Sequence, residues 1–305
     1  MYISSDKPIE KNTEIAHFEE ILAFKSSVHS MQNIERWNER ALHWEKSILT
    51  KTEDKINTPR IRELISFLKK EGALDKTTSV LDIGGGVGVI ASALAKDAKD
   101  VLVMDFSSEM CRVGRNLASK KNEQNVDFLE ADFFAFDVDE NGFKGKFDLV
   151  FSALSPSIKY GGLDKCLSIS KKYFANESYV SREVELYTQI EKEVFGVRRE
   201  DTFDGHWSGF YAMTNLLFLK GYYPKVAYIR ESEEHTVLYS DEILTDAMIF
   251  LSRTLGIENN DENRGKVDAY IRKTASKENN KLLIPYNNRT VYGVTLVDVR
   301  ERDVR

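Results

Sequence analysis

A glycine-rich turn directly after an apolar run restricts this chain to few folds. Residues 80–88 read VLDIGGGVG, with glycines at the alternate positions 84, 86 and 88, and the helical pattern GVIASALAKDA follows. Glycine lacks a β-carbon, so the backbone can turn tightly and approach a ligand closely at these positions. A strand, a glycine turn and a helix in this order predict a parallel α/β sheet with a ligand at the turn.

The alternation of strand and helix continues along the chain. SVLDIGG, VLVMDF, VDFLEADFF and FDLVFSAL read as buried strands, GLDKCLSISKKYF as a helix, SYVSREVE as a fifth strand and RTVYGVTLVDVR as a last strand. Residues 186–209 read as irregular, and FYAMTNLLFLKGYYP reads as a further helix. Buried apolar strands separated by helices favour a parallel sheet covered by helices on both faces.

Helical patterns also flank the sheet region. Residues 13–31 and the segment ERWNERALHWEK carry apolar side chains about one turn apart. A third helix is well marked, because Thr58 can cap it and Pro59 suits its first position. We therefore expect an N-terminal helical cap over 1–58 and a catalytic domain over 59–305. A helical insertion is expected at about 241–280 of that domain.

The composition limits the classes of partner. The formal net charge is −6 and the pI is near 5.6, which argues against general nucleic-acid binding and predicts no DNA partner. Cys111 and Cys166 are far apart and suggest neither a disulfide framework nor a zinc site, so no metal is expected. The polar N-terminus and the short apolar runs predict neither a signal peptide nor a membrane span. A cytoplasmic location is the resulting expectation, and the oligomeric state stays open.

Acidic residues near the ends of the predicted strands indicate what the turn binds. Asp105 ends the second strand, where its carboxylate can accept hydrogen bonds from both hydroxyls of a ribose. Asp82 precedes the glycines, where it would repel a pyrophosphate but can face an ammonium group. Asp132 follows the third strand and can receive an adenine amino group. Together these positions predict a nucleoside that carries an amino group.

These segments resemble, in the right order, the class I S-adenosylmethionine-dependent methyltransferases, in particular the small-molecule enzymes of the type 11/12 kind. VLDIGGGVG looks like their first motif, VLVMDFSSEM like their DxSxxM segment, NVDFLEADFF like the adenine-contact motif and FDLVFSALSPSI like the strand-four motif, over roughly residues 79–158. The resemblance implies a Rossmann-like, doubly wound, mostly parallel seven-stranded sheet. It also implies S-adenosyl-L-methionine as cofactor and S-adenosyl-L-homocysteine as product.

The resemblance also implies a role for each matching residue. The glycines would hold the methionine end, Asp82 would lie near its amino group, Asp105 would bind the ribose, and Asp132 would bond the adenine amino group. The implied cofactor contacts are Asp82, Gly84, Gly86, Gly88, Asp105, Phe106, Met110, Asp132, Phe133 and Ser152. The segment ERWNERALHWEK resembles the capping helix of small-molecule members. SALSPS differs from the NPPF-like sequence of enzymes that methylate nucleobase amines, which disfavours a nucleic-acid substrate.

Candidates for the acceptor site come from polar or aromatic segments near the predicted ligand edge. His206 is a candidate proton acceptor because imidazole titrates near neutral pH, and Tyr160 is a second catalytic candidate. The candidate substrate-binding residues are His43, Trp44, Ser155, Trp207 and Tyr211. Each of them is also a residue type that packs structurally in such segments. Methyl transfer from a sulfonium needs alignment and exclusion of water, and it needs a base only for acceptors of high pKa.

Several functions stay open on the sequence. The first is methyl transfer to a small molecule at N, O, S or C. The second is methyl transfer to a protein or RNA, and the third is a non-catalytic protein that binds the same nucleoside. A nicotinamide oxidoreductase is the fourth, because Gly86-x-Gly88-x-x-Ala91 fits a looser dinucleotide pattern.

Overall fold

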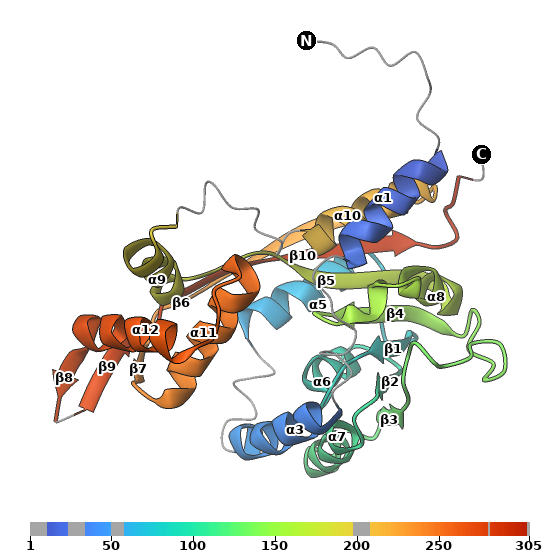
Figure 1. Cartoon of the computed structure of the whole chain (residues 1–305). Coiled ribbons are helices and arrows are strands. Elements are labelled where there is room, and N and C mark those ends of the chain that lie inside the picture. Colours follow the sequence, from blue (N-terminus) through green and yellow to red (C-terminus); the bar gives the residue numbers. More distant parts are fainter. Residues whose placement is uncertain (1–10, 24–33, 50–57, 198–207, 280, 304–305) are drawn as a thin grey trace, which may run out of the picture. The chain divides into compact units, whose positions relative to one another are not determined.

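The computed structural model describes residues 11–23, 34–49, 58–197, 208–279 and 281–303 (Figure 1). The chain forms two compact units, each continuous in space but not in sequence. The first unit comprises 1–178, 209–229 and 293–305, and the second comprises 179–208 and 230–292. The predicted insertion at about 241–280 therefore lies inside the second unit, which also takes in segments on both sides of it.

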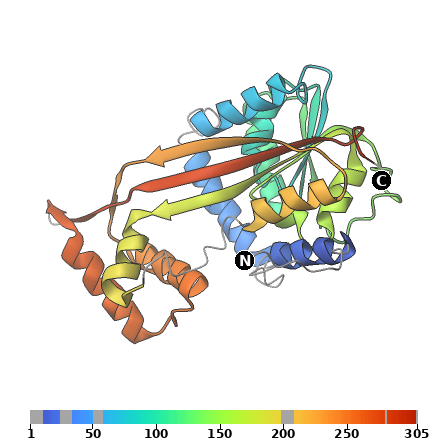
Figure 2. The ribbon, with the colours of Figure 1, turned by 90° about the horizontal axis from the view of Figure 1, so that it is seen from above.

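A seven-stranded sheet has the strand order β3-β2-β1-β4-β5-β10-β6. Its strands are β1 (Ser79–Ile83), β2 (Asp100–Asp105), β3 (Val126–Glu130), β4 (Phe147–Ala153), β5 (Ser170–Val184), β6 (Lys225–Glu233) and β10 (Asn288–Asp298). The pairs β1–β2, β1–β4, β2–β3 and β4–β5 are parallel. In Figure 2 the arrow of β10 points opposite to those of β5 and β6. This mostly parallel sheet confirms the predicted Rossmann-like class, and the carboxyl ends of β1 to β4 meet at one edge.

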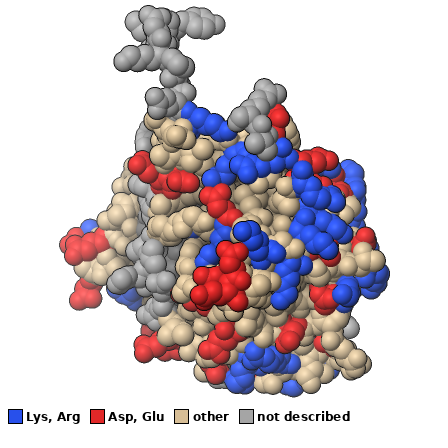
Figure 3. Space-filling model, turned by 90° about the vertical axis from the view of Figure 1, so that its right-hand side faces the viewer, with Lys and Arg blue, Asp and Glu red and all other residues tan. Residues whose placement is uncertain are grey.

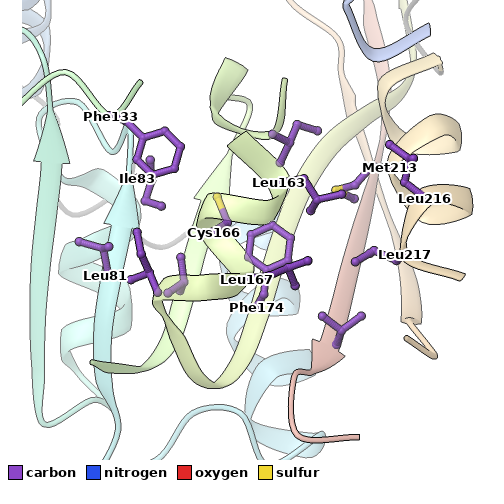
Figure 4. Packing of buried hydrophobic residues seen from close by; sticks show 14 of the residues in the cluster. Leu81, Ile83, Phe133, Leu163, Cys166, Leu167, Phe174, Met213, Leu216 and Leu217 are labelled. Carbon is purple, nitrogen blue, oxygen red and sulfur yellow. The ribbon is translucent and has the colours of Figure 1, made fainter. Parts of the chain in front are cut away.

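One face of the sheet is covered by three helices, α1 (Lys11–Ala23), α8 (Gly162–Ile169) and α10 (Ser208–Leu219) (Figure 1). Their apolar side chains pack against strand residues in one large cluster. Figure 4 shows Leu163, Cys166 and Leu167 of α8 between the strand residues and the α10 residues Met213, Leu216 and Leu217. Leu22 of α1 belongs to the same cluster. The helix α1 is thus part of the core.

The other face carries α6 (Val89–Ala95) and α7 (Ser108–Lys120), with α5 (Pro59–Lys70) beside α6 and α3 (Ile34–Leu49) against α7. Ala41 of α3 is fully buried in a cluster with Val87, Met110, Val113 and Leu117. The predicted start of α5 is confirmed, because the Thr58 hydroxyl accepts a hydrogen bond from the Ile61 amide and Pro59 is the first helical residue. The predicted helix over 35–46 is also confirmed as part of α3.

A buried ion pair attaches the start of α5 to the sheet. Arg60 donates two hydrogen bonds to the Glu177 carboxylate, from Nε to Oε1 at 3.0 Å and from Nη2 to Oε2 at 2.5 Å. The Glu177 side chain is 0% exposed and its strand β5 pairs with β4 at Ala153. The Glu177 carbonyl also accepts a hydrogen bond from the Leu154 amide, directly after β4. The ion pair thus stabilises the sheet next to the loop that follows β4.

The second unit has a core of its own. It contains α9 (Glu185–Phe195), α11 (Asp241–Leu255), α12 (Asp261–Thr274) and a three-stranded sheet of β7 (Thr236–Leu238), β9 (Lys281–Pro285) and β8 (Ser276–Glu278). Both pairs in this sheet are antiparallel. Tyr187 packs its ring 4.8 Å from that of Phe250 and hydrogen-bonds the Tyr286 hydroxyl at 3.1 Å.

Two predicted elements are wrong in their limits. The helix expected over 162–174 ends at Ile169, because the Ser170 hydroxyl bonds the Cys166 carbonyl and the chain continues as β5. The segment expected to be irregular from residue 186 forms the helix α9, which ends at Gly196 in the left-handed conformation (φ +66°). Within the described residues, no helix combines the length and apolar character that a membrane crossing needs.

Candidate active site

The glycine turn after β1 is tightly built. Gly84 has φ +71°, its amide donates to the Met104 carbonyl at 2.7 Å, and a β-carbon there would overlap the Ser155 hydroxyl. Gly88 has φ +78° and is the N-cap residue of α6, and a β-carbon there would lie 2.8 Å from the ring of Phe128. Both positions require glycine, because the backbone is left-handed and there is no room for a side chain. The turn thus brings its backbone against the ends of the neighbouring strands.

Asp105 ends β2 beside this turn. Its Oδ2 accepts a hydrogen bond from the Gly86 amide at 2.9 Å, and its Oδ1 accepts one from the Ser107 amide at 3.0 Å. The residue is buried, and burial raises the pKa of its carboxyl although the amides of Ser107, Gly86 and Phe106 lower it. A carboxylate has about four lone-pair positions, so both oxygens keep capacity for further donors. The two amides therefore hold the carboxylate in a fixed orientation.

Asp82 lies in β1 and is 2% exposed. Its Oδ2 atom is buried and has no hydrogen-bond partner among the described residues. Burial, with a smaller contribution from the negative charge of Asp105, raises the pKa of Asp82 to about 7. A buried carboxylate oxygen without a donor is costly, and in native proteins it indicates a missing partner. An ammonium group is a partner of the right charge.

The loop after β3 carries the residues expected at the adenine ring. Asp132 is exposed, and its Oδ1 accepts a hydrogen bond from the Phe134 amide at 2.9 Å. Phe133 is buried in the large core cluster near Ile83, so its ring packs inward (Figure 4). On the β2 side, Phe106 is half-buried, and Met110 is buried with its sulfur 3.7 Å from the β-carbon position of Gly86. Asp132 thus lies just after β3, and Met110 lies in the first turn of α7, which follows the neighbouring strand β2.

The loop after β4 lies beside the glycine turn. Ser152 is fully buried and its hydroxyl is 2.6 Å from that of Ser157. Leu154 and Tyr160 have left-handed backbones with φ +52° and +50°, which is uncommon for residues with side chains and is frequent at functional sites. Tyr160 is 47% exposed and its ring lies 6.4 Å from that of Phe134. Ser155, through the Gly84 contact, lies nearest to the glycine turn.

The N-terminal helices contribute a residue that the sequence analysis missed. Asn38 of α3 accepts a hydrogen bond through Oδ1 from the Ser107 hydroxyl at 2.7 Å, and Ser107 in turn caps α7. This contact fixes α3 beside the Asp105 turn. A single asparagine within this helix gave no signal in sequence. Tyr211 of α10 is 45% exposed, with its ring 5.7 Å from Phe18 of α1.

Four of the predicted acceptor residues cannot be placed in detail. His43 and Trp44 belong to α3, but their side chains lie outside the described part of the structure. His206 and Trp207 also fall outside the described residues. Their proposed roles stay predictions.

Among the described residues of the first unit, a surface cavity of about 580 Å³ lies between α5 and α6, and another of about 400 Å³ lies between α1, α8 and α10. The second is lined in part by Ile158, Tyr160 and Gly161. Neither cavity is lined by Asp82, Gly84, Gly86 or Gly88. Among the described residues, no group of three or more His, Cys, Asp or Glu side chains is placed to hold a metal ion.

Residues 80–168 match a protein-family model described as a methyltransferase domain. This segment belongs to the methyltransferase-domain family. The match begins at β1 and ends in α8, so it contains the glycine turn, Asp105 and the loops after β3 and β4. The predicted class I family is thereby confirmed, together with S-adenosylmethionine as its cofactor.

The chain is similar to solved structures. A protein from Anaeromyxobacter dehalogenans, provisionally named a type II methyltransferase, is 15% identical with a TM-score of 0.50, over 78% of this chain and 96% of its own. A provisionally named methyltransferase from Bacillus halodurans is 16% identical with a TM-score of 0.46, over 77% and 98%. At these identities the first similarity establishes the methyltransferase domain's fold and no more. No curated protein matches the chain.

Proposed function

We propose that the methyltransferase domain transfers the methyl group of S-adenosylmethionine to a small-molecule nucleophile. One observation carries the proposal: the buried Oδ2 of Asp82 has no partner among the described residues, beside a glycine turn that is closed by the Asp105 carboxylate. A methionine ammonium and a ribose are the donors that these two carboxylates lack.

The residues present fit this cofactor. Asp82 would hold the ammonium, and the backbone of the turn at Gly84, Gly86 and Gly88 would lie against the methionine end. Asp105 would accept hydrogen bonds from the two ribose hydroxyls while the amides of Gly86 and Ser107 keep it oriented. Phe106 and Met110 would pack against the adenine, and Asp132 would accept a hydrogen bond from its amino group. Phe133 and Ser152 are both buried. Phe133 would pack behind the site of the adenine ring, and Ser152 behind the site of the cofactor sulfur.

When bound, the cofactor supplies an electrophilic methyl group on a sulfonium. The chain's own residues then have to align the acceptor and exclude water. Ser155 lies against the glycine turn and would orient the acceptor, and the exposed Tyr160 hydroxyl would form a hydrogen bond with it. When the acceptor is of high pKa, its proton would pass to the imidazole of His206, the proposed base. We extend the acceptor site to His43, Trp44, Tyr211, His206 and Trp207, which belong to the neighbouring helices and the segment before α10.

The charge distribution supports a small acceptor over a nucleic acid. The net charge is −6, and Figure 3 shows acidic side chains among the basic ones on one face. Several lysines of the first unit pair with carboxylates, among them Lys69 with Asp97 and Lys172 with Asp148. A nucleic-acid site needs a basic surface that is free to contact phosphates. We also propose a cytoplasmic location, which the two free, buried cysteines support.

A thermal-shift comparison tests the cofactor directly. S-adenosylhomocysteine at about 100 times its Kd should stabilise the protein by about 2.7 kcal/mol, whereas NAD should give no shift. Stabilisation by NAD alone would support the oxidoreductase alternative and contradict the proposal. Turnover of labelled S-adenosylmethionine against a metabolite library then tests the acceptor class. Methylation of RNA or protein with no metabolite methylated would contradict a small-molecule acceptor, and cofactor binding without any turnover would favour the non-catalytic alternative.

A further inference from the structure

A lysine on α8 collects three backbone carbonyls of the loop that follows β3. The Lys165 ammonium donates to the carbonyls of Phe133 at 2.8 Å, Phe134 at 3.0 Å and Phe136 at 2.8 Å. An ammonium has three donors, so this arrangement uses all of them. The ammonium also lies 5.2 Å from the centre of the Phe133 ring. Because three carbonyls converge on this half-buried ammonium, Lys165 differs from a surface lysine whose ammonium is solvated by water.

The direction of these carbonyls decides where the neighbouring amides point. In a trans peptide the carbonyl and the following N–H point in opposite directions. The Phe133 carbonyl faces Lys165, so the Phe134 amide points away from it, and that amide donates to the Asp132 Oδ1 at 2.9 Å. Lys165 and the Asp132 carboxylate are thus held on opposite sides of one peptide group. The carboxylate is exposed on its side.

The same loop is fixed to the end of β2. The Ala131 amide donates to the Asp105 carbonyl at 2.9 Å, and the Phe136 amide donates to the Asp132 carbonyl at 2.8 Å. The loop is therefore held at its start by Asp105 and across its middle by Lys165. Charged hydrogen bonds are roughly twice as strong as neutral ones, which makes Lys165 the dominant restraint on the middle of the loop.

We propose that Lys165 is a positioning residue for adenine recognition, which fixes the loop after β3 so that Asp132 can accept the exocyclic amino group. This inference rests on the proposed function, because it assumes that the ligand at this edge is an adenosine. Lys165 does not touch the ligand. Loss of Lys165 should therefore weaken the contacts of the purine end of the cofactor and leave the contacts of its methionine end unchanged.

The experiment compares S-adenosylhomocysteine with S-inosylhomocysteine, whose purine carries an oxo group in place of the amino group and a proton on the adjacent N1. Calorimetry gives the Kd of each for the wild-type protein and for Lys165→Met, which keeps the side-chain length without its donors. We expect Lys165→Met to weaken S-adenosylhomocysteine about tenfold and S-inosylhomocysteine less than about twofold. Lys165→Arg, which keeps a charged donor, should retain most of the preference for the amino group.

Lys220→Met is the matched control. The side chain of Lys220, which follows α10, is 15% exposed, and its ammonium donates to Asp164 of α8 at 3.0 Å instead of to the loop after β3. It should lower stability without changing the ratio of the two Kd values. If Lys165→Met weakened the binding of both ligands equally, so that the ratio of their Kd values stayed the same, the inference would be overturned.

A second variant covers the case in which Lys165→Met does not fold. Asp132→Ala removes an exposed side chain together with the hydrogen bond that it accepts from the Phe134 amide, and it should abolish the preference for the amino group while Lys165 is intact. If that preference persists, Asp132 does not recognise the amino group and the inference is wrong. Failure of the wild-type protein to bind S-adenosylhomocysteine would instead contradict the proposed function itself, so the two failures can be told apart.

Discussion

One carboxylate in each unit of this protein illustrates a difference in hydrogen bonding. In the first unit, Asp82 is buried, lacks a partner for Oδ2 among the described residues, and has a raised pKa. In the second, Asp268 of α12 accepts hydrogen bonds from Arg272 and from the Tyr239 hydroxyl. Burial opposes ionisation of Asp268, but these bonds outweigh it and lower its pKa. A carboxylate that the fold itself satisfies stabilises the fold, whereas one that the fold leaves unsatisfied indicates a ligand.

Glu177 provides the intermediate case, because it is as deeply buried as Asp82 but is paired with Arg60. Arg60→Met should lower the free energy of unfolding by about 3 kcal/mol, since it leaves a buried charge without a partner. Urea denaturation measures this value. Adding Glu177→Gln should recover much of the loss. Lys69→Met, which removes an exposed ion pair with Asp97, should cost less than about 1 kcal/mol. Equal costs for the two pairs would contradict the role assigned to burial.

The Asp105 carboxylate should carry the largest share of cofactor affinity. Asp105→Ala removes the acceptor for both ribose hydroxyls, and hydrogen bonds to a charged group contribute about 1.5–3 kcal/mol, so the Kd of S-adenosylhomocysteine should rise roughly 10- to 100-fold. Calorimetry measures the Kd. Asp268→Asn is the control from the second unit and should leave it unchanged. An unchanged Kd in Asp105→Ala would exclude the ribose assignment.

Asp82 should make cofactor binding depend on pH. Its carboxyl is half ionised at about pH 7, and only the ionised form can pair with an ammonium, so affinity should rise about tenfold between pH 6 and pH 8. Asp82→Asn should bind weakly at pH 8 and lose this dependence. A wild-type Kd that is constant over this range would show that Asp82 does not face the ammonium.

The same group has the opposite effect on the protein without cofactor. A pKa raised in the folded state means that the folded protein holds more protons than the unfolded chain, so stability falls as the pH rises from about 4 to about 7. Asp82→Asn should remove this fall and be more stable than the wild type at pH 8. Thermal denaturation across the pH range gives the comparison, and a wild-type curve parallel to that of the variant would refute it.

Asp268 should show the smallest effect. Its side chain is 28% exposed, so Asp268→Asn should lower stability by less than about 1 kcal/mol. Because its pKa is lowered in the folded state, its contribution should be present at neutral pH and disappear only in acid, below the ordinary pKa of an aspartate. Unfolding measured at pH 7 and pH 3 tests both points.

Local sequence patterns were sufficient to predict several features of the fold and of the proposed cofactor site. The glycine turn, the position of Asp105 and the capping of α5 by Thr58 depend on residues close together in sequence. The helix α9 was missed although Leu186, Tyr187 and Ile190 form an apolar stripe and Gly196 ends it. Its polar flanking residues had suggested a loop, and the stripe becomes meaningful only with the core that covers it.

Other features depend on contacts between distant residues. The limit between α8 and β5 was misplaced because Phe174 continues the apolar spacing of the helix, whereas in the fold it pairs with Val150 in the sheet. Lys165 and the carbonyls it collects are separated by some thirty residues of chain, and no periodicity connects them. The acceptor site likewise depends on loops, whose side-chain arrangement is set by packing and not by a local pattern.

The two cysteines have a practical consequence for following the motions of this protein. Cys111 is buried in α7 with its sulfur 3.7 Å from the Asp105 carbonyl, and burial raises the pKa of its thiol to about 11, while Cys166 is buried against the opposite face of the sheet. Protonated, inaccessible thiols react with alkylating reagents only when the surrounding structure opens. The native chain therefore contains two thiols that can report local opening, one beside the proposed ribose site and one on the buried side of α8. Their separate labelling rates, resolved by peptide mass spectrometry, would measure how often the structure opens on each side of the sheet.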